Sequence, residues 1–206
     1  MLSEDSYKTV ASLSQGIYRD KGSRFVAFAC PVNSEDDIKE QLAKWRKEFY
    51  DAQHHCYAFR IGKDQEVYRV NDDGEPSGSA GRPIYGQILS HELTNILIVV
   101  LRYFGGTKLG IPGLINAYKT AAKEALGHAS IVVKTINVGY EISYDYVSMN
   151  EVMKTLKDDN ATIIDQTFDN RCILSFSVRR NRIGKILSRL GKINGIVIKP
   201  ERVFYS

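Results

Sequence analysis

Two segments of the chain carry residues whose types and spacing could support chemistry. The first is the turn-forming run Asp72–Pro83, DDGEPSGSAGRP, which contains three carboxylates, two serines and an arginine. The second is Arg102–Gly110, RYFGGTKLG, which combines two cations with two aromatic rings and three glycines. Carboxylates act as general bases or metal ligands, and a glycine-rich loop beside cations binds anions through its backbone N–H groups.

Known catalytic patterns do not fit either segment. Neither Ser77 nor Ser79 has the glycine two residues before it that a serine-hydrolase elbow requires. The glycines at 105 and 110 have the spacing of a nucleotide-hydrolysing P-loop. Ile111 and Pro112, however, stand where that loop needs lysine and serine or threonine. The first segment therefore reads either as a binding loop or as a solvated connector.

The nearest approach to a metal-binding sequence is His54, His55 and Cys56. Adjacent side chains on an extended backbone point to opposite faces, so both histidines would rarely bind one ion. The chain also lacks HExxH and paired CxxC motifs. We therefore predict no metal site and no cofactor, with these residues at the entry of a strand.

The strand before the second segment and the helix after it are arranged as in an anion-binding site. Ile96–Leu101 is a branched apolar run with the length of a buried strand, and Pro112 marks a helix start that continues to about Gly127. The order strand, glycine loop, helix suits a phosphate or RNA-backbone cradle made of Arg102, Lys108 and loop amides. The alternative is a tight turn, in which the glycines let strand and helix pack closely.

Other elements are predicted by periodicity and capping signals. In the first part we predict a helix over Ser34–Tyr50 with Ser34 as N-cap, because apolar residues recur there at helical spacing. Strands are expected at Phe25–Cys30, Tyr57–Ile61 and Val67–Val70, with a short helix over Arg82–His91.

The pattern changes near residues 129–134, and the remainder of the chain has the predicted order βαββαβ of a ferredoxin-like domain. A strand over Thr135–Tyr144 precedes a helix that begins with a capping box of Ser148 and Glu151. Next come a hairpin, a second helix and a last strand. We predict them at Ala161–Phe168 with Arg171–Val178, at 183–190, and within Gly191–Val203.

The chain has 206 residues and a net charge of +4, and the positive excess lies in its C-terminal third. Arg182, Lys185 and Arg189 share one helical face with no glutamate between them, and Arg179 and Arg180 precede them. Such a stripe is either a solvated helix face or a surface that contacts RNA phosphates.

Composition indicates a globular protein, with 43% hydrophobic and 25% charged residues. Three distant cysteines fit reduced thiols, the N-terminus is polar, and no apolar run has membrane-spanning length. We therefore expect a cytoplasmic protein without a membrane partner.

The two motifs together, in this order, resemble the IMPACT/YigZ family over nearly the whole chain, from about Gly16 onward. The resemblance implies an α+β protein with two domains. Residues 1–130 would form an IMPACT-type domain similar to the second domain of a small-subunit ribosomal protein, with a left-handed βαβ crossover. Residues 131–206 would form a ferredoxin-like domain as in elongation factor G.

The resemblance also implies a shared surface. It maps here to Asp73, Gly74, Glu75, Pro76, Ser77, Gly78, Gly81, Arg82 and Pro83, and to Arg102, Tyr103, Phe104, Gly105, Gly106, Lys108 and Gly110. Many members have a basic residue in place of Asn116, and a glycine pair in place of Pro112-Gly113. These two departures weaken the expectation of strong anion binding at this helix start.

Eukaryotic members of the family act in translational control by binding a large scaffold protein. We therefore expect a non-enzymatic, translation-associated regulator that binds RNA, the ribosome or a translation factor. One alternative is an enzyme or binding protein for a small phosphorylated or nucleotide ligand, with Glu75 as general base and Arg102 and Lys108 as charge clamps. Another is a module that binds only proteins.

Overall fold

The computed structural model describes residues 5–63 and 67–205, and this part of the chain is a mixed α/β structure with two five-stranded sheets and five α-helices. It divides into two compact units, one formed by Lys8–Val133 and the other by Met1–Tyr7 with Lys134–Ser206. The backbone N–H of Ile136 donates to the carbonyl oxygen of Asp5, which ties the N-terminal segment to the second unit. A division into domains 1–130 and 131–206 stays a prediction.

The unit Lys8–Val133 is built on one antiparallel sheet with the strand order β2-β3-β6-β4-β5. Strands β3 and β4 both run antiparallel to β6, so they are parallel to each other, and helix α1 connects them. Strand β1 (Ser6–Val10) precedes the sheet and contains the boundary between the two units. The elements that follow are β2 (Ser14–Asp20), β3 (Ser23–Pro31), α1 (Glu35–Glu48), β4 (His54–Ile61), β5 (Val67–Asn71), α2 (Gly81–Ser90), β6 (Ile96–Tyr103) and α3 (Gly110–Gly127).

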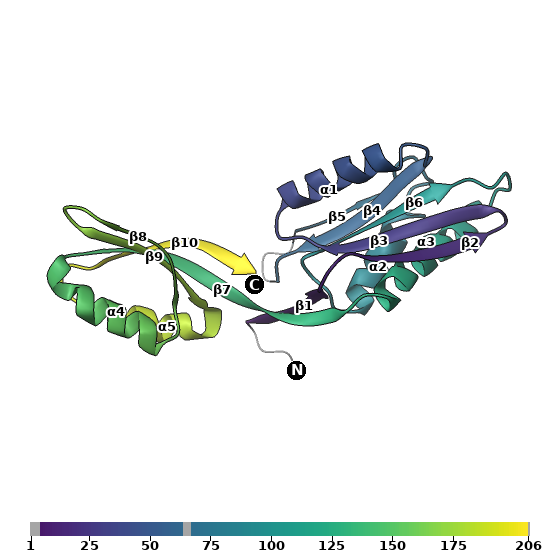
Figure 1. The fold of residues 1–206 in the computed structure, drawn as a ribbon. Helices are drawn as coiled ribbons and strands as arrows, with labels where there is room; N and C mark the ends of the chain where they lie inside the picture. Colours follow the sequence, from purple (N-terminus) through teal and green to yellow (C-terminus); the bar gives the residue numbers. More distant parts are fainter. Residues whose placement is uncertain (1–4, 64–66, 206) are drawn as a thin grey trace. The chain divides into compact units, whose positions relative to one another are not determined.

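The central strand β6 is buried on both faces, as its branched apolar run predicted. Helices α2 and α3 cover one face of the sheet and α1 covers the other (Figure 1). Because side chains alternate along a strand, Ile98 and Val100 face α2 and α3, whereas Leu97 and Val99 face α1. The side chains of the two residues that follow Leu101 in β6 therefore point to opposite faces of the sheet.

The predicted helix after residue 34 is confirmed as α1. The hydroxyl oxygen of Ser34 accepts a hydrogen bond from the backbone N–H of Asp37 at 3.1 Å, which satisfies one of the free donors at the helix start. On the buried face, the Trp45 ring stacks on Phe28 with a centroid distance of 5.3 Å.

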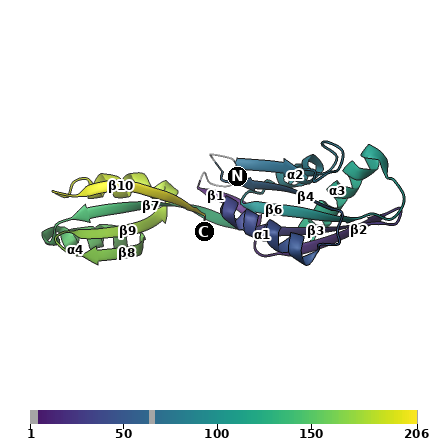
Figure 2. The same cartoon turned by 90° about the horizontal axis from the view of Figure 1, so that it is seen from above.

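The other unit has the element order βαββαβ, with strands β10, β7, β9 and β8 side by side (Figure 2). Strand β1 also pairs with β7. The elements are β7 (Ile131–Tyr144), the 3₁₀ turn η1 (Tyr146–Ser148), α4 (Met149–Asp158), β8 (Thr162–Phe168), β9 (Cys172–Arg179), the 3₁₀ turn η2 (Arg180–Arg182), α5 (Ile183–Leu190) and β10 (Val197–Tyr205). Both helices contribute to one apolar core, with Leu156 of α4 and Ile186 of α5 buried in it.

The predicted capping box at the start of α4 is wrong. Ser148 has helical backbone angles, φ −92° and ψ −2°, and its side chain caps no backbone N–H. The cause is the 3₁₀ turn η1, which already places Ser148 in a helical conformation, whereas an N-cap residue needs an extended one.

Among the described residues, no helix has both the length and the apolar content needed to cross a bilayer. All three cysteines are buried free thiols.

Alanine substitutions at two glycines are expected to change the free energy of unfolding in opposite directions. A Cβ on Gly16 of β2 would lie 2.2 Å from the backbone nitrogen of Ala125 in α3, whereas a Cβ on Gly86 of α2 meets nothing within 4 Å. We expect Gly16→Ala to lower the free energy of unfolding by about 1–3 kcal/mol through overpacking. Gly86→Ala should raise it by roughly 0.5–1 kcal/mol, because it restricts the unfolded chain. Urea unfolding midpoints measure both, and equal effects would contradict the close approach of β2 and α3.

Candidate functional site

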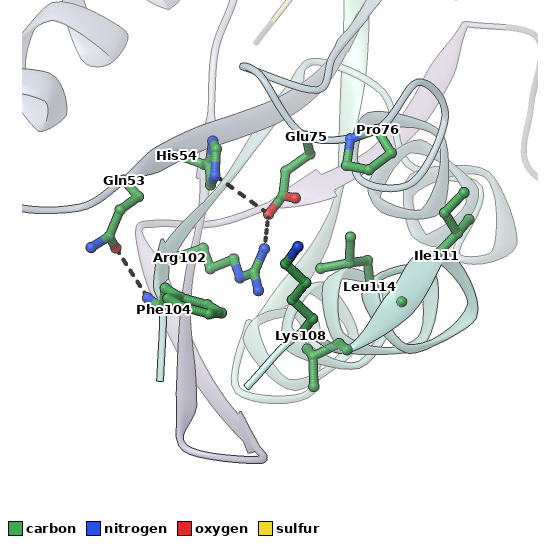
Figure 3. Close-up of a pocket in the computed structure, with 11 residues that line it drawn as sticks. Gln53, His54, Glu75, Pro76, Arg102, Phe104, Lys108, Ile111 and Leu114 are labelled. Atoms are coloured by element: carbon green, nitrogen blue, oxygen red, sulfur yellow. Dashed lines mark hydrogen bonds and ion pairs between the residues drawn. The ribbon is translucent and has the colours of Figure 1, made fainter. Parts of the chain in front are cut away.

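The two motif segments meet around a cavity of about 540 Å³ within the unit Lys8–Val133 (Figure 3). The cavity lies where the loop after β5, the end of β6 and the start of α3 come together. Its polar lining comes from Gln53, His54, Glu75, Arg102 and Lys108. Its apolar lining is provided by Pro76, Phe104, Leu109, Ile111 and Leu114. The volume is in the range of small-molecule sites, roughly 300–1,000 Å³.

The carboxylate of Asp72 shapes the loop before α2. It accepts hydrogen bonds from the backbone N–H groups of Gly78 at 2.8 Å, Ala80 at 3.0 Å and Gly81 at 2.8 Å. Burial raises the pKa of Asp72, but these three bonds and the nearby Arg82 charge outweigh it and leave the pKa below the ordinary carboxyl value. Asp72 therefore has a structural role, in which its ionised form holds the loop.

Asp73 fastens the same loop to its neighbours. Its carboxylate accepts from the backbone N–H of His55 at 2.6 Å and from the Arg46 side chain at 2.9 Å. The carbonyl oxygen of Asp73 lies 2.8 Å from Nδ1 of His54. The predicted site residue Asp73 thus positions His54, and its own side chain does not line the cavity.

Glu75 joins the two motifs at the floor of the cavity. Its side chain is only 4% exposed, and Oε1 accepts from Nη1 of Arg102 at 2.6 Å and from the hydroxyl of Tyr118 at 2.7 Å. Nε2 of His54 lies 3.9 Å from the same oxygen. Beneath them, the Cys56 thiol contacts the Tyr118 hydroxyl at 3.3 Å, and burial raises the pKa of both Cys56 and Tyr118. An ion pair buried this deeply is stable only with such additional hydrogen bonds.

Arg102 is held by aromatic rings and has a buried N–H without a partner among the described residues. The residue is 7% exposed, and among the described residues its Nε has no hydrogen-bond partner. The guanidinium carbon lies 5.6 Å from the centroid of the Phe25 ring and 5.5 Å from that of Phe104. Aromatic contacts therefore hold the guanidinium in place while one buried N–H remains without an acceptor.

Lys108 and the start of α3 form the other side of the cavity. Lys108 is exposed, its side chain runs along the cavity (Figure 3), and it has no hydrogen bond or ion pair with any described residue. Helix α3 begins beside it at Gly110, with Leu109 as an N-cap that provides no side-chain hydrogen bond, and its first turn contains no acidic residue. Its first N–H groups are thus available to an acceptor.

Other predicted residues lie outside the cavity. Tyr103 comes directly after Arg102 in β6 and therefore faces the α1 side, where its hydroxyl donates to Asp51 at 3.3 Å and Arg24 lies 4.2 Å from its ring centroid. Ser77 and Arg82 are exposed and do not line the cavity.

The glycines of the second motif support the packing interpretation at one position. A Cβ on Gly105 would lie 1.9 Å from the carbonyl carbon of Gly22, so this residue must be glycine for the two turns to meet. Gly106 has a φ of +85° and open space around it, which indicates a backbone role.

Sequence reasoning missed His54 and Tyr118 as part of the site, whereas Phe104 belongs to the surface that the family resemblance implied. The two histidines do point to opposite faces, as an extended backbone predicts, with His54 at the cavity and His55 buried on the other face, where burial lowers its pKa. Within the described chain, no group of three or more histidine, cysteine, aspartate or glutamate residues is arranged to hold a metal ion. The helical spacing of Leu114 and Tyr118 was the available signal, because it places both on the inner face of α3.

The basic stripe has acidic partners that are distant from it along the sequence. The Asp159 side chain is 3% exposed and accepts from Lys185 at 2.8 Å and from Arg189 at 2.8 Å, which lowers its pKa. Arg189 also pairs with Asp158 at 2.9 Å.

The other cations of the stripe are close to polar groups as well. Nη1 of Arg182 donates to the carbonyl oxygen of Asp159 at 3.4 Å, and Arg179 pairs with Asp5. Arg180 also interacts with another group of the protein. Contact of this stripe with RNA stays a prediction. The surface carries less net positive charge than the sequence suggested, because carboxylates lie next to its cations.

Removing one partner of the buried pair should be costly. Glu75→Ala would leave the Arg102 charge uncompensated in a site that is 7% exposed, so we expect the free energy of unfolding to fall by about 3–5 kcal/mol. Glu40→Ala, at an exposed position of α1, is the matched control and should change it by no more than about 0.5 kcal/mol. Chemical denaturation measures both, and similar small losses would contradict the role assigned to the pair.

Because of Asp72, we expect the stability of the protein to depend on pH in the acid range. Its pKa is lower in the folded than in the unfolded chain, so its contribution is complete above the ordinary carboxyl value of about 3.9 and is lost as the pH falls through the folded value. Asp72→Asn should cost roughly 1–3 kcal/mol at pH 7, because backbone donors lose their acceptor. The variant should also lose less stability than the parent between about pH 4 and pH 2. Unfolding curves across this range test both effects, and parallel profiles would refute the assignment.

Comparisons with known proteins agree with the two motifs. A family model described as the Impact N-terminal domain matches residues 21–126. The IMPACT family member YvyE of Bacillus subtilis is 35% identical over 74% of this chain and 70% of its own length. YigZ of Escherichia coli is 28% identical over 82% of this chain and 84% of its own length. A crystal structure of a hypothetical protein superimposes with a TM-score of 0.75 at 25% identity, covering 97% of this chain and 99% of that one.

Proposed function

Because the chain belongs to the IMPACT family, we propose that it is a cytoplasmic, non-enzymatic, translation-associated regulator that acts by binding RNA, alone or within the ribosome. Eukaryotic members of the family act in translational control, and this supports a translation-related partner. The observation that carries the RNA component is the cavity where the two motifs meet, with Lys108 and the uncapped start of α3 beside the Glu75–Arg102 pair.

Binding rather than catalysis is supported by the chemistry of the cavity. Among its described lining residues none is serine, threonine or cysteine, and the nearby Cys56 thiol is buried beneath Tyr118 with a raised pKa. Glu75, the residue considered as a general base, is already an acceptor for Arg102 and Tyr118. A carboxylate used in this way stabilises a binding surface, because it compensates the guanidinium charge.

The domain assignments belong to the same proposal. We assign the second unit to the ferredoxin-like fold of elongation factor G on the basis of its βαββαβ order and its strand order β8-β9-β7-β10. The first unit is assigned to the ribosomal-protein-like fold. Its support is that β3 and β4 are parallel, are joined by α1, and have β6 between them.

The α5 stripe is proposed as a second, weaker RNA contact. Its five cations, Arg179, Arg180, Arg182, Lys185 and Arg189, have three carboxylates close to them, those of Asp5, Asp158 and Asp159. Lys185 keeps 68% of its side chain exposed while it pairs with Asp159, so its charge remains near the surface. The buried Asp159 carboxylate is stabilised by these cations. Charge reversal at Lys185 would therefore destabilise the fold, and a loss of RNA binding by that variant could not be assigned to the stripe.

The test is co-sedimentation with ribosomes and filter binding to single-stranded RNA at salt concentrations between about 50 and 200 mM. Lys108→Glu should weaken binding and lower the slope of log affinity against log salt by about one, since one phosphate contact is lost. Lys119→Glu, at an exposed position of α3 outside the cavity, is the matched control and should leave the slope unchanged. Equal behaviour of the two variants, or no RNA binding by the parent protein, would overturn the proposal.

A further inference from the structure

We propose that the cavity holds one unstacked nucleotide of a single-stranded RNA, with the base inside against Phe104 and its phosphate outside at Lys108. This inference rests on the proposed function and adds to it which chemical group enters the cavity and in which direction. Three features of the cavity support it, namely the charge balance of the floor, the apolar wall and the cationic rim.

The floor is electrically compensated, which selects a neutral polar group. Arg102 already has Glu75 as its counter-ion at 2.6 Å, so an anion that reached the floor would come close to a buried carboxylate. The floor can nevertheless accept a hydrogen bond, because Oε2 of Glu75 accepts none from the described residues. An available carboxylate oxygen is complementary to an edge that carries an N–H donor.

A nucleobase offers such an edge together with a flat apolar face. The Phe104 ring is 46% exposed, and its backbone N–H donates to the Gln53 side chain at 3.0 Å, which fixes the residue next to the cavity. Ile111 and Leu114 line the cavity as well. Proteins that bind single-stranded RNA stack splayed-out bases on aromatic side chains, and the Phe104 ring, with the Arg102 guanidinium 5.5 Å from its centroid, is such a side chain.

The rim supplies the charge that the floor does not. Lys108 is exposed and unpaired with any described residue, and the first turn of α3 next to it has no capping side chain and no acidic residue. Pro112 in that turn has no N–H, so Gly110 and Ile111 provide the amides that have no acceptor within the helix. A phosphate at this position would meet a lysine and a helix N-terminus.

The experiment separates the base from the phosphates. Binding of fluorescein-labelled single-stranded RNA octamers is compared with that of an octamer of the same charge in which the bases have been removed. The parent protein should prefer the octamer with bases. Phe104→Ala should weaken binding of that octamer about tenfold, as expected for the loss of one stacked base, and should leave the abasic octamer unaffected. Lys108→Ala should weaken the binding of both.

Phe168→Ala is the matched control, because its ring on β8 is 49% exposed and lies in the other unit. It should bind both octamers like the parent, and circular dichroism with urea unfolding verifies that each variant is folded. If Phe104→Ala binds the octamer with bases as tightly as the parent, the base pocket is refuted while the proposed RNA-binding function stands. If the parent binds no RNA, both fail. Binding of free nucleoside monophosphates without binding of the octamer would replace this inference with a small-ligand site.

Discussion

The ion pair between Glu75 and Arg102 is the interaction on which the first unit's cavity depends. Two charges that are both less than 10% exposed are tolerated when they are paired and further hydrogen-bonded, and the Tyr118 hydroxyl supplies the additional hydrogen bond for Glu75. The pair also fixes geometry, because it connects the loop before α2 to the end of the central strand. Asp72 and Asp73 then hold the loop in the conformation that delivers Glu75 to its partner.

Much of the architecture was predictable from local patterns. The central strand β6, the capped helix α1 and the βαββαβ order of the second unit are confirmed, because burial and capping leave strong periodic signals. The family resemblance is confirmed as well. The predicted capping box at Ser148 is wrong because a 3₁₀ turn precedes α4 and already gives Ser148 a helical conformation. No residue pattern in the sequence predicted this turn.

The site was less predictable, for physical reasons that differ between residues. The period of two along β6 already separates Tyr103 from Arg102, so that distinction was available from the sequence. The partners of Lys185 and Arg189 were not, since Asp159 lies far from them along the chain and only tertiary packing brings its carboxylate beneath α5. The same holds for Tyr118, whose helical position predicts burial but not a hydrogen bond to Glu75.

The close contact between β2 and α3 has a consequence for the opposite end of that helix. Gly16 has no side chain to separate β2 from α3, so the strand lies directly against the helix backbone at Glu124 and Ala125. The same helix begins at Gly110, where it lines the cavity. One continuous helix therefore joins the tightest contact with β2 to the site at the other end.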